Sequence, residues 1–138
     1  MAITSSKAFH YTYLGAEWAR VAIRNLIGDK RIKIITAIAL LLNLISWVGG
    51  ILIIRFLGNE QAVLHYNIVF GIDLIGDPKG VLLIPVAGLL IILSNLLLAA
   101  SLSDARDKIL SIMFLSVSLV SNFFVVLAIY LIYLINFS

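Results

Sequence analysis

The residues best suited to chemistry outside the long apolar runs of this chain are His65, Asn67, Asp73 and Asp77. A histidine near carboxylates can bind a metal ion or transfer protons. Their spacing fits no zinc signature, residues 59–80 contain no serine for a hydrolase triad, and the chain has no glycine-rich phosphate loop. We therefore expect no catalysis, no metal site and no cofactor, and we expect these groups to serve structure or docking.

A second set of polar residues lies inside the apolar runs, and each run contributes one asparagine to it. Amide and hydroxyl side chains in such runs hydrogen-bond across neighbouring helices, at about 0.6 kcal/mol for an average bond. Interhelical bonding is the favoured interpretation, and a polar groove for a ligand or a partner helix is the alternative. The set comprises Asn43, Ser46, Asn95, Ser118 and Asn122.

The depth of these residues follows from a helical rise of about 1.5 Å per residue. Counted from the ends of the apolar runs, Asn43 should lie level with Ser118, whereas Ser46 should lie level with Asn122 and Gly88. The spacing of Thr36, Asn43 and Gly50 by seven predicts one packing seam. The indole N–H of Trp47 needs an acceptor, and we expect a serine on a neighbouring helix.

The runs themselves define the fold class. Of the 138 residues, 62% are hydrophobic and 12% are charged, against about 25% charged in a soluble domain. Apolar runs of this length can cross a hydrocarbon core of about 30 Å. The sequence predicts an all-α integral membrane protein with three transmembrane helices, within residues 34–54, 81–101 and 109–137. Because the third run is long, we expect its membrane span to end near Leu131.

The composition of the spans excludes several functions. None of the three runs contains Asp, Glu, Lys, Arg or His, and proton relays, voltage sensors and ion pathways usually need such a residue. A pump or proton-coupled transporter is therefore not expected. Three helices enclose a pore poorly, so a channel would require several copies of the chain.

Residues 7–27 form a candidate amphipathic helix that lies on the membrane as an N-terminal interfacial element. Packing on another subunit is the alternative. Residues 29–33, DKRIK, should form a basic hinge between this helix and the first span. The chain then divides into residues 1–33 and a transmembrane domain, residues 34–137, with an outer connection at 55–80. Lipid headgroups should contact Trp18, Arg20, Arg24, Lys30 and Arg31.

Basic residues predict the orientation of the protein. Eight of the ten Lys and Arg residues lie before the first span or between the second and third, and only Arg55 and Lys79 lie on the other side. The positive-inside rule places the first group in the cytoplasm. We therefore expect a multi-pass protein of the cytoplasmic (inner) membrane, with its N-terminus inside and its C-terminus outside.

The outer connection has its own pattern. From Leu64 to Leu74 every even position is apolar, and most odd positions are polar or small, which is typical of an extended segment with one apolar face. We expect this short extracytoplasmic segment to press its even face onto the outer ends of the helices or into the membrane interface. Its backbone should pair with itself through a turn, with another copy or with a partner. Asp77-Pro78-Lys79-Gly80 should form a type I turn. The candidate partner or ligand surface is His65, Tyr66, Asn67, Phe70 and Asp73.

The strings LHYNI (64–68) and FGIDLIG (70–76), followed by an apolar span, resemble a family of small uncharacterised three-helix membrane proteins of candidate-phylum bacteria. The resemblance covers residues 34–135 and is strongest at 64–76. Where those proteins often carry aromatic residues after the second glycine, this chain has Asp77, Pro78 and Lys79. The resemblance implies the three-helix topology and the importance of 64–76, and it implies no activity.

These features together favour a non-catalytic subunit or scaffold in a larger membrane assembly. The expected partners are anionic lipids of the cytoplasmic leaflet and a membrane protein or further copies of this chain, and nucleic acid is not expected. One alternative is a membrane protein that binds a lipid or small ligand through residues 64–80. A second is a homo-oligomeric channel lined by the Asn and Ser residues of the spans.

Overall fold

The computed structural model describes residues 15, 17, 20, 28–67, 69, 71–102 and 108–137, without the side chains of Tyr66, Asn67 and Asp73. In this part of the chain the elements are α2 (Lys30–Leu57), β1 (Ala62–Asn67), β2 (Gly71–Gly76), a 3-10 helix η1 (Pro78–Leu82), α3 (Leu83–Ser101) and α4 (Lys108–Phe137). Gly15, Glu17 and Arg20 are helical. The rest of the helix expected at 7–27, including Trp18 and Arg24, lies outside the described residues.

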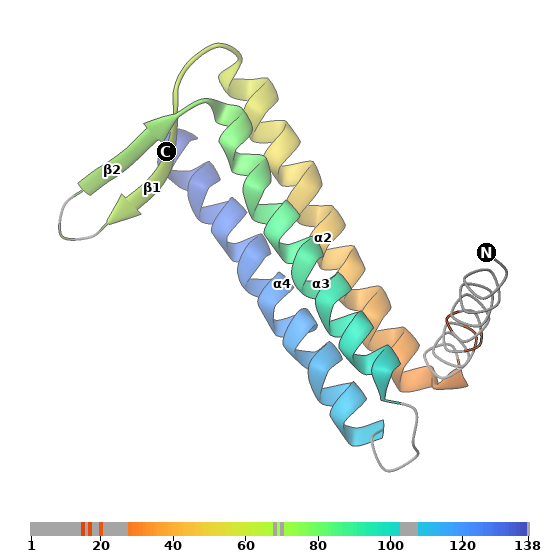
Figure 1. Ribbon diagram of the computed structural model, residues 1–138. Helices are drawn as coiled ribbons and strands as arrows, with labels where there is room; N and C mark the ends of the chain where they lie inside the picture. Colours follow the sequence, from red (N-terminus) through yellow and green to blue (C-terminus); the bar gives the residue numbers. More distant parts are fainter. Residues whose placement is uncertain are drawn as a thin grey trace, which may run out of the picture.

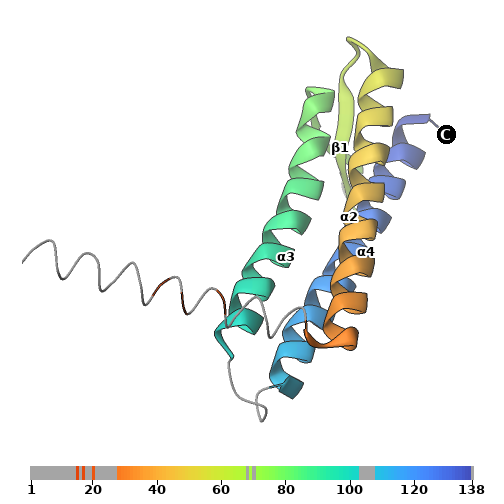
Figure 2. The same cartoon turned by 90° about the vertical axis from the view of Figure 1, so that its right-hand side faces the viewer.

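The three long helices confirm the predicted membrane-spanning class. Segments of 28, 24 and 30 residues, namely Lys30–Leu57, Pro78–Ser101 and Lys108–Phe137, are long and apolar enough to cross a bilayer. Helices α2 and α4 run in the same direction and α3 runs back against both, as Figures 1 and 2 show. The β-hairpin and the C-terminal end of α4 therefore lie at one end of the bundle, which we call the hairpin end.

The first helix begins earlier than the sequence suggested. Asp29 is its N-cap, because the Asp29 carboxylate accepts a 2.7 Å hydrogen bond from the backbone N–H of Arg31. The expected basic hinge at 29–33 is therefore wrong beyond Asp29: residues 30–33 are the first turn of α2. At its other end α2 continues to Leu57, so the outer connection begins three residues later than expected.

The bundle is held by narrow seams of small and branched residues. The buried positions of α2 are spaced by three and four residues, and the same spacing recurs in α4. That spacing is typical of left-handed helix packing. The α2 seam consists of Ala39, Asn43, Ser46, Gly50, Ile53 and Leu57, so it includes the predicted Asn43 and Gly50. Thr36, expected on the same seam, is half-buried.

The extended segment pairs with itself, which was one of the three pairings expected. β1 and β2 form an antiparallel two-stranded sheet in which Ala62 is opposite Gly76 and Asn67 is opposite Gly71. The register shifts by one residue at His65, which is opposite Leu74, and returns at Tyr66. Gly71 closes the hairpin with a φ of 77°, a conformation that favours glycine.

The even face of the hairpin packs on the helices only near its base. Ala62 is fully buried and Leu64 packs beside it against a core cluster of Ile53, Leu57, Val81, Ile129 and Ile132. Ile72 and Leu74 are half exposed. Of the two surfaces expected to cover this face, the helices cover only its base, because the hairpin projects sideways beyond the bundle (Figure 1). Contact of the remaining even residues with the membrane interface stays a prediction.

The connection from the hairpin into α3 is tighter than a simple turn. The backbone N–H of Gly80 donates to the carbonyl of Asp77 at 2.8 Å, as a type I turn requires, and the chain continues as η1. Helix α4 runs to Phe137 and so continues beyond Leu131, near which its membrane span is expected to end. The extra length has a role, because Asn136 in its last turn reaches β1.

Candidate functional site

The spans meet at a pair of buried asparagines. Asn43 of α2 donates from Nδ2 to Oδ1 of Asn122 on α4 at 3.0 Å and to the carbonyl of Pro85 on α3 at 2.9 Å. Its own Oδ1 accepts the indole N–H of Trp47 at 3.1 Å. The expectation that Trp47 would bond a serine on a neighbouring helix is therefore wrong, because an acceptor one turn away on the same helix is already fixed by the asparagine pair.

Asn122 completes the cluster on the other side. Its Nδ2 donates to the carbonyl of Gly88 on α3 at 3.2 Å and to the carbonyl of Ser118 in its own helix at 2.9 Å. A primary amide has two N–H donors. All four donors of the pair are therefore used, and three helices are joined at one point. We call Asn43, Asn122, Pro85, Gly88 and Trp47 the amide cluster.

Close approach at Gly88 makes this cluster possible. A Cβ atom at Gly88 would lie 2.7 Å from Oδ1 of Asn122 and 2.8 Å from Nδ2 of Asn43. Both distances are shorter than any normal contact of a Cβ atom. The α3 backbone is thus within hydrogen-bonding reach of both amides only because position 88 has no side chain.

The common depth predicted for Asn122 and Gly88 is confirmed by their hydrogen bond. The depth predicted for Asn43, level with Ser118, was wrong for a simple reason. Counting assumed that the first helix starts at Ile34, but the Asp29 cap moves the start to Lys30. Asn43 then lies thirteen residues after Lys30, and Asn122 lies fourteen residues after Lys108. At one rise per residue the two amides are level, so Asn43 meets Asn122 and not Ser118.

Ser46 and Asn95, two further members of the predicted set, make local bonds. Ser46 is fully buried and donates to the carbonyl of Leu42. Asn95 donates to the carbonyl of Ile91 at 2.9 Å, within its own helix. The Ser118 hydroxyl is buried without a hydrogen-bond partner, although its carbonyl serves the amide cluster. The structure brings Asn43, Asn122 and the Ser118 backbone together, whereas Ser46 and Asn95 each donate to a carbonyl of their own helix.

A second amide at the hairpin end was missed by sequence reasoning. Asn136 of α4 accepts the backbone N–H of Val63 at 2.9 Å and donates to the carbonyl of Val63, also at 2.9 Å. This side chain therefore binds β1 as a neighbouring strand would. A lone asparagine in the last turn of an apolar run was the available signal.

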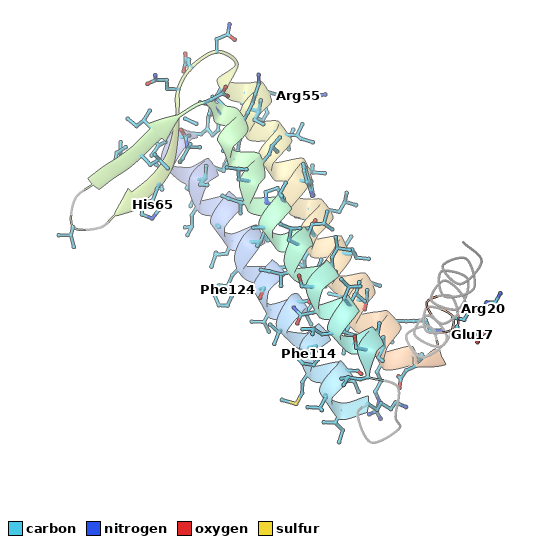
Figure 3. The ribbon with its side chains drawn as sticks, in the orientation of Figure 1. Glu17, Arg20, Arg55, His65, Phe114 and Phe124 are labelled. Carbon is cyan, nitrogen blue, oxygen red and sulfur yellow. The ribbon has the colours of Figure 1, made fainter. Side chains whose placement is uncertain are left out.

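Among the residues predicted as a partner surface, the structure describes the side chain of His65. His65 is exposed on β1, at the hairpin end where Arg55 also lies (Figure 3). Tyr66, Asn67 and Asp73 are placed by their backbones in the two strands. Phe70 and the remaining side chains of this set lie outside the described residues.

The opposite end of the bundle carries an ion pair. Nζ of Lys108, at the start of α4, lies 2.6 Å from Oδ2 of Asp29. This ion-paired hydrogen bond, with the N–H of Arg31, holds the pKa of the Asp29 carboxyl below its usual value. Lys30, Arg31 and Lys33 beside it are exposed, and Arg20 pairs with Glu17 at 3.2 Å (Figure 3).

Other chemistry has little to build on in the described part of the chain, where no three His, Cys, Asp or Glu residues gather into a possible metal site. The polar groups that do converge are amides bonded to amides and to backbone carbonyls. Comparison of the chain with protein-family models, with curated proteins and with solved structures found no match.

Proposed function

We propose that this protein is a non-catalytic subunit or scaffold of a larger membrane assembly, held in the cytoplasmic membrane by three spans. The observation that carries the proposal is the amide cluster. Asn43 and Asn122 are the span residues best suited to line a pore or hold a ligand, yet every N–H of both amides is bonded within the protein. They lock three helices together, and neither of these two amides has an N–H donor left for a transported species.

The surfaces left for function are then the outer faces of the helices and the hairpin. Large apolar side chains cover the outside of each span, for example Leu44 on α2, Leu97 on α3 and Phe124 on α4, which are 58, 63 and 59% exposed. Lipid or a partner helix can cover such faces. The polar hairpin residues His65, Asn67 and Asp73 are proposed to face a partner outside the membrane.

The orientation is part of the same proposal. Lys30, Arg31, Lys33 and Lys108 lie at the end of the bundle opposite the hairpin. The positive-inside rule places that end in the cytoplasm, where Arg20, Lys30 and Arg31 contact anionic lipid, and places the hairpin outside. The chain has no cysteine, so single cysteines report the topology directly. An impermeant thiol reagent should label Gln61→Cys and not Ala105→Cys in intact cells, and the reverse pattern would invert the orientation.

The assembly itself is tested by purification of the full-length protein from its native membrane in a mild detergent, followed by native mass spectrometry. We expect a stoichiometric membrane-protein partner. Substitutions Leu44→Trp, Leu97→Trp and Phe124→Ala, one on each helix, should separate the partner-bound face from the lipid-facing ones, because only one of them should reduce partner recovery.

Other results of the same experiment would replace the proposal. A protein that purifies alone with a retained lipid or small molecule would support the ligand-binding alternative. A symmetric ring of copies that conducts ions in planar bilayers would support the channel. His65→Ala and Asp73→Ala should leave membrane insertion intact and lower partner recovery if the hairpin takes part.

A further inference from the structure

The two edges of the hairpin differ in their contacts with the rest of the protein. β1 packs on α4 and on η1, and β2 packs on β1. Figure 1 shows β1 between β2 and α4. The outer edge of β1 is bound by Asn136, whose amide takes both backbone groups of Val63. In the described part of the chain no element lies along the outer edge of β2.

The bonds at Val63 also fix which backbone groups of β2 point outward. In an antiparallel pair, opposite residues turn their N–H and C=O groups either toward each other or both away from the pair. Val63 turns its groups away from β2, toward Asn136, and its opposite residue is Ile75. Ile75 therefore turns its own N–H and C=O away from β1, to the open edge.

Three large apolar side chains lie along this edge, on both sides of the charged Asp73 in the sequence. Ile72 and Leu74 lie on one face and Ile75 on the other, and each is about half exposed, at 51, 52 and 53%. Natural edge strands are usually protected by lysine, proline or a covering element. β2 contains neither lysine nor proline, and its one charged residue is Asp73, where the register is irregular. A two-stranded hairpin is only marginally stable by itself.

We propose that the open edge of β2 binds an extended peptide segment of a partner protein, which pairs through its backbone and alternates apolar side chains. Main-chain groups at Ile75 would give the hydrogen bonds, and Ile72, Leu74 and Ile75 would contact the flanking side chains of the added strand. This inference rests on the proposed scaffold function in one respect: it takes the molecule that binds the open edge of β2 to be a protein.

A second copy of this chain fits the edge less well. Asp73 lies in the middle of β2. Any two-fold antiparallel pairing of β2 with itself, centred near the middle of the strand, places the two copies of Asp73 at opposite or diagonal positions. Like charges in such positions destabilise a strand pair. A partner strand with a neutral or basic residue there avoids this cost.

The test uses the full-length protein in phosphatidylcholine nanodiscs and a defined probe. The probe is an acetylated eight-residue peptide of alternating Val and Thr with Lys at both ends, and its control is the same peptide N-methylated at alternate amides. We expect the unmethylated probe to slow hydrogen exchange of the Ile75 amide, measured by NMR, by about ten-fold, the effect of one backbone hydrogen bond. The methylated peptide should have no effect.

Two variants separate backbone pairing from simple apolar contact. Ile75→Pro removes an N–H that faces away from β1, a place where edge strands tolerate proline. It should weaken probe binding, measured by fluorescence anisotropy, by about ten-fold, whereas Ile75→Val should bind as the natural protein does. Exchange at Val63 should stay unchanged in Ile75→Pro, which shows that the hairpin remains tethered.

Several outcomes would overturn the proposal. Unchanged exchange at Ile75 up to the solubility limit of the probe would show that the edge does not accept a strand. Equal slowing by the methylated peptide would show apolar contact alone. If exchange of the Ile75 amide slows without the probe as the protein concentration rises, the edge binds a second copy. If exchange without the probe is slow in the nanodisc but not in detergent, the edge is covered by lipid. Loss of probe binding in Ile75→Pro with unchanged recovery of the membrane partner would locate that partner elsewhere and leave the scaffold function standing.

Discussion

Nδ2 of Asn43 lies 3.0 Å from Oδ1 of Asn122, and this bond joins two parallel helices whose asparagines are 79 residues apart in the chain. The same two amides also bind carbonyls of α3 at Pro85 and Gly88. One buried cluster therefore fixes the relative positions of all three spans. Substitutions on each of the three helices can test it.

The first prediction concerns the space beside the pair. Gly88→Ala places a methyl group within 2.8 Å of both amides, so the α3 backbone must move and the bonds to Gly88 and Pro85 must lengthen. We expect a loss of stability of about 1–3 kcal/mol, as for other overpacked interiors. Thermal unfolding in detergent measures it. Leu90→Ala, on the exposed side of the same helix, is the matched control and should have little effect.

The second prediction concerns the bond itself. Asn43→Leu and Asn122→Leu should each destabilise the bundle, because each leaves the remaining amide with fewer partners. The double variant should lose less than the sum of the two. We expect a coupling energy of about 0.6 kcal/mol and no more than about 1.7, the range found for bonds between membrane helices. Strictly additive effects in this double-mutant cycle would show that the two amides do not act as a pair.

The third prediction concerns the attachment of the hairpin. Asn136→Leu removes both hydrogen bonds to Val63, so the Val63 amide should exchange with solvent faster while the centres of the helices are unaffected. Asn136→Asp keeps an acceptor for the Val63 N–H and loses the donor, and it should give an intermediate rate. Asn95→Leu is the control, because Asn95 bonds within α3. Unchanged exchange at Val63 in Asn136→Leu would mean that Leu64 and Ala62 alone hold the hairpin.

The fourth prediction is a pH dependence at the end opposite the hairpin. The pKa of Asp29 is lowered from 3.8 by its hydrogen bond with Lys108, so the folded state binds this proton less readily than the unfolded state. The stabilisation is therefore present above pH 3.8 and is lost as pH falls through the lower pKa of the folded state. Asp29→Asn should remove it.

The measurement compares melting temperatures of the natural protein and Asp29→Asn between pH 7 and pH 3, the ends of a range chosen to enclose the ordinary carboxylate value of about 3.9. The difference between the two proteins should be small, because Lys108 is largely exposed, and it should shrink toward pH 3. Lys108→Met should behave like Asp29→Asn at neutral pH. A difference that grows as the solution becomes more acidic would reverse the sign of the argument.

What the sequence determined by itself was the presence of three helices able to span a membrane and the extended form of the connection after the first of them. Apolar length gave the three spans, and the alternation from Leu64 to Leu74 gave the extended segment. Both follow from short-range periodicity, which depends on each residue and its near neighbours. Asn43 and Asn122 could be singled out for a related reason, since a polar side chain in an apolar run needs a partner.

Which partner each polar group takes was decided only by the tertiary structure. One cap at Asp29 shifts the start of α2, and this brings Asn43 level with Asn122. Asn95, which the sequence offers equally, bonds within its own helix. Likewise, nothing in the sequence shows which group Asn136 would bind. Its bond to β1 forms because α4 extends far enough to reach the edge of that strand. Such contacts depend on where helices begin, how long they run and how closely their backbones approach, and these are properties of the packed bundle that no single segment contains.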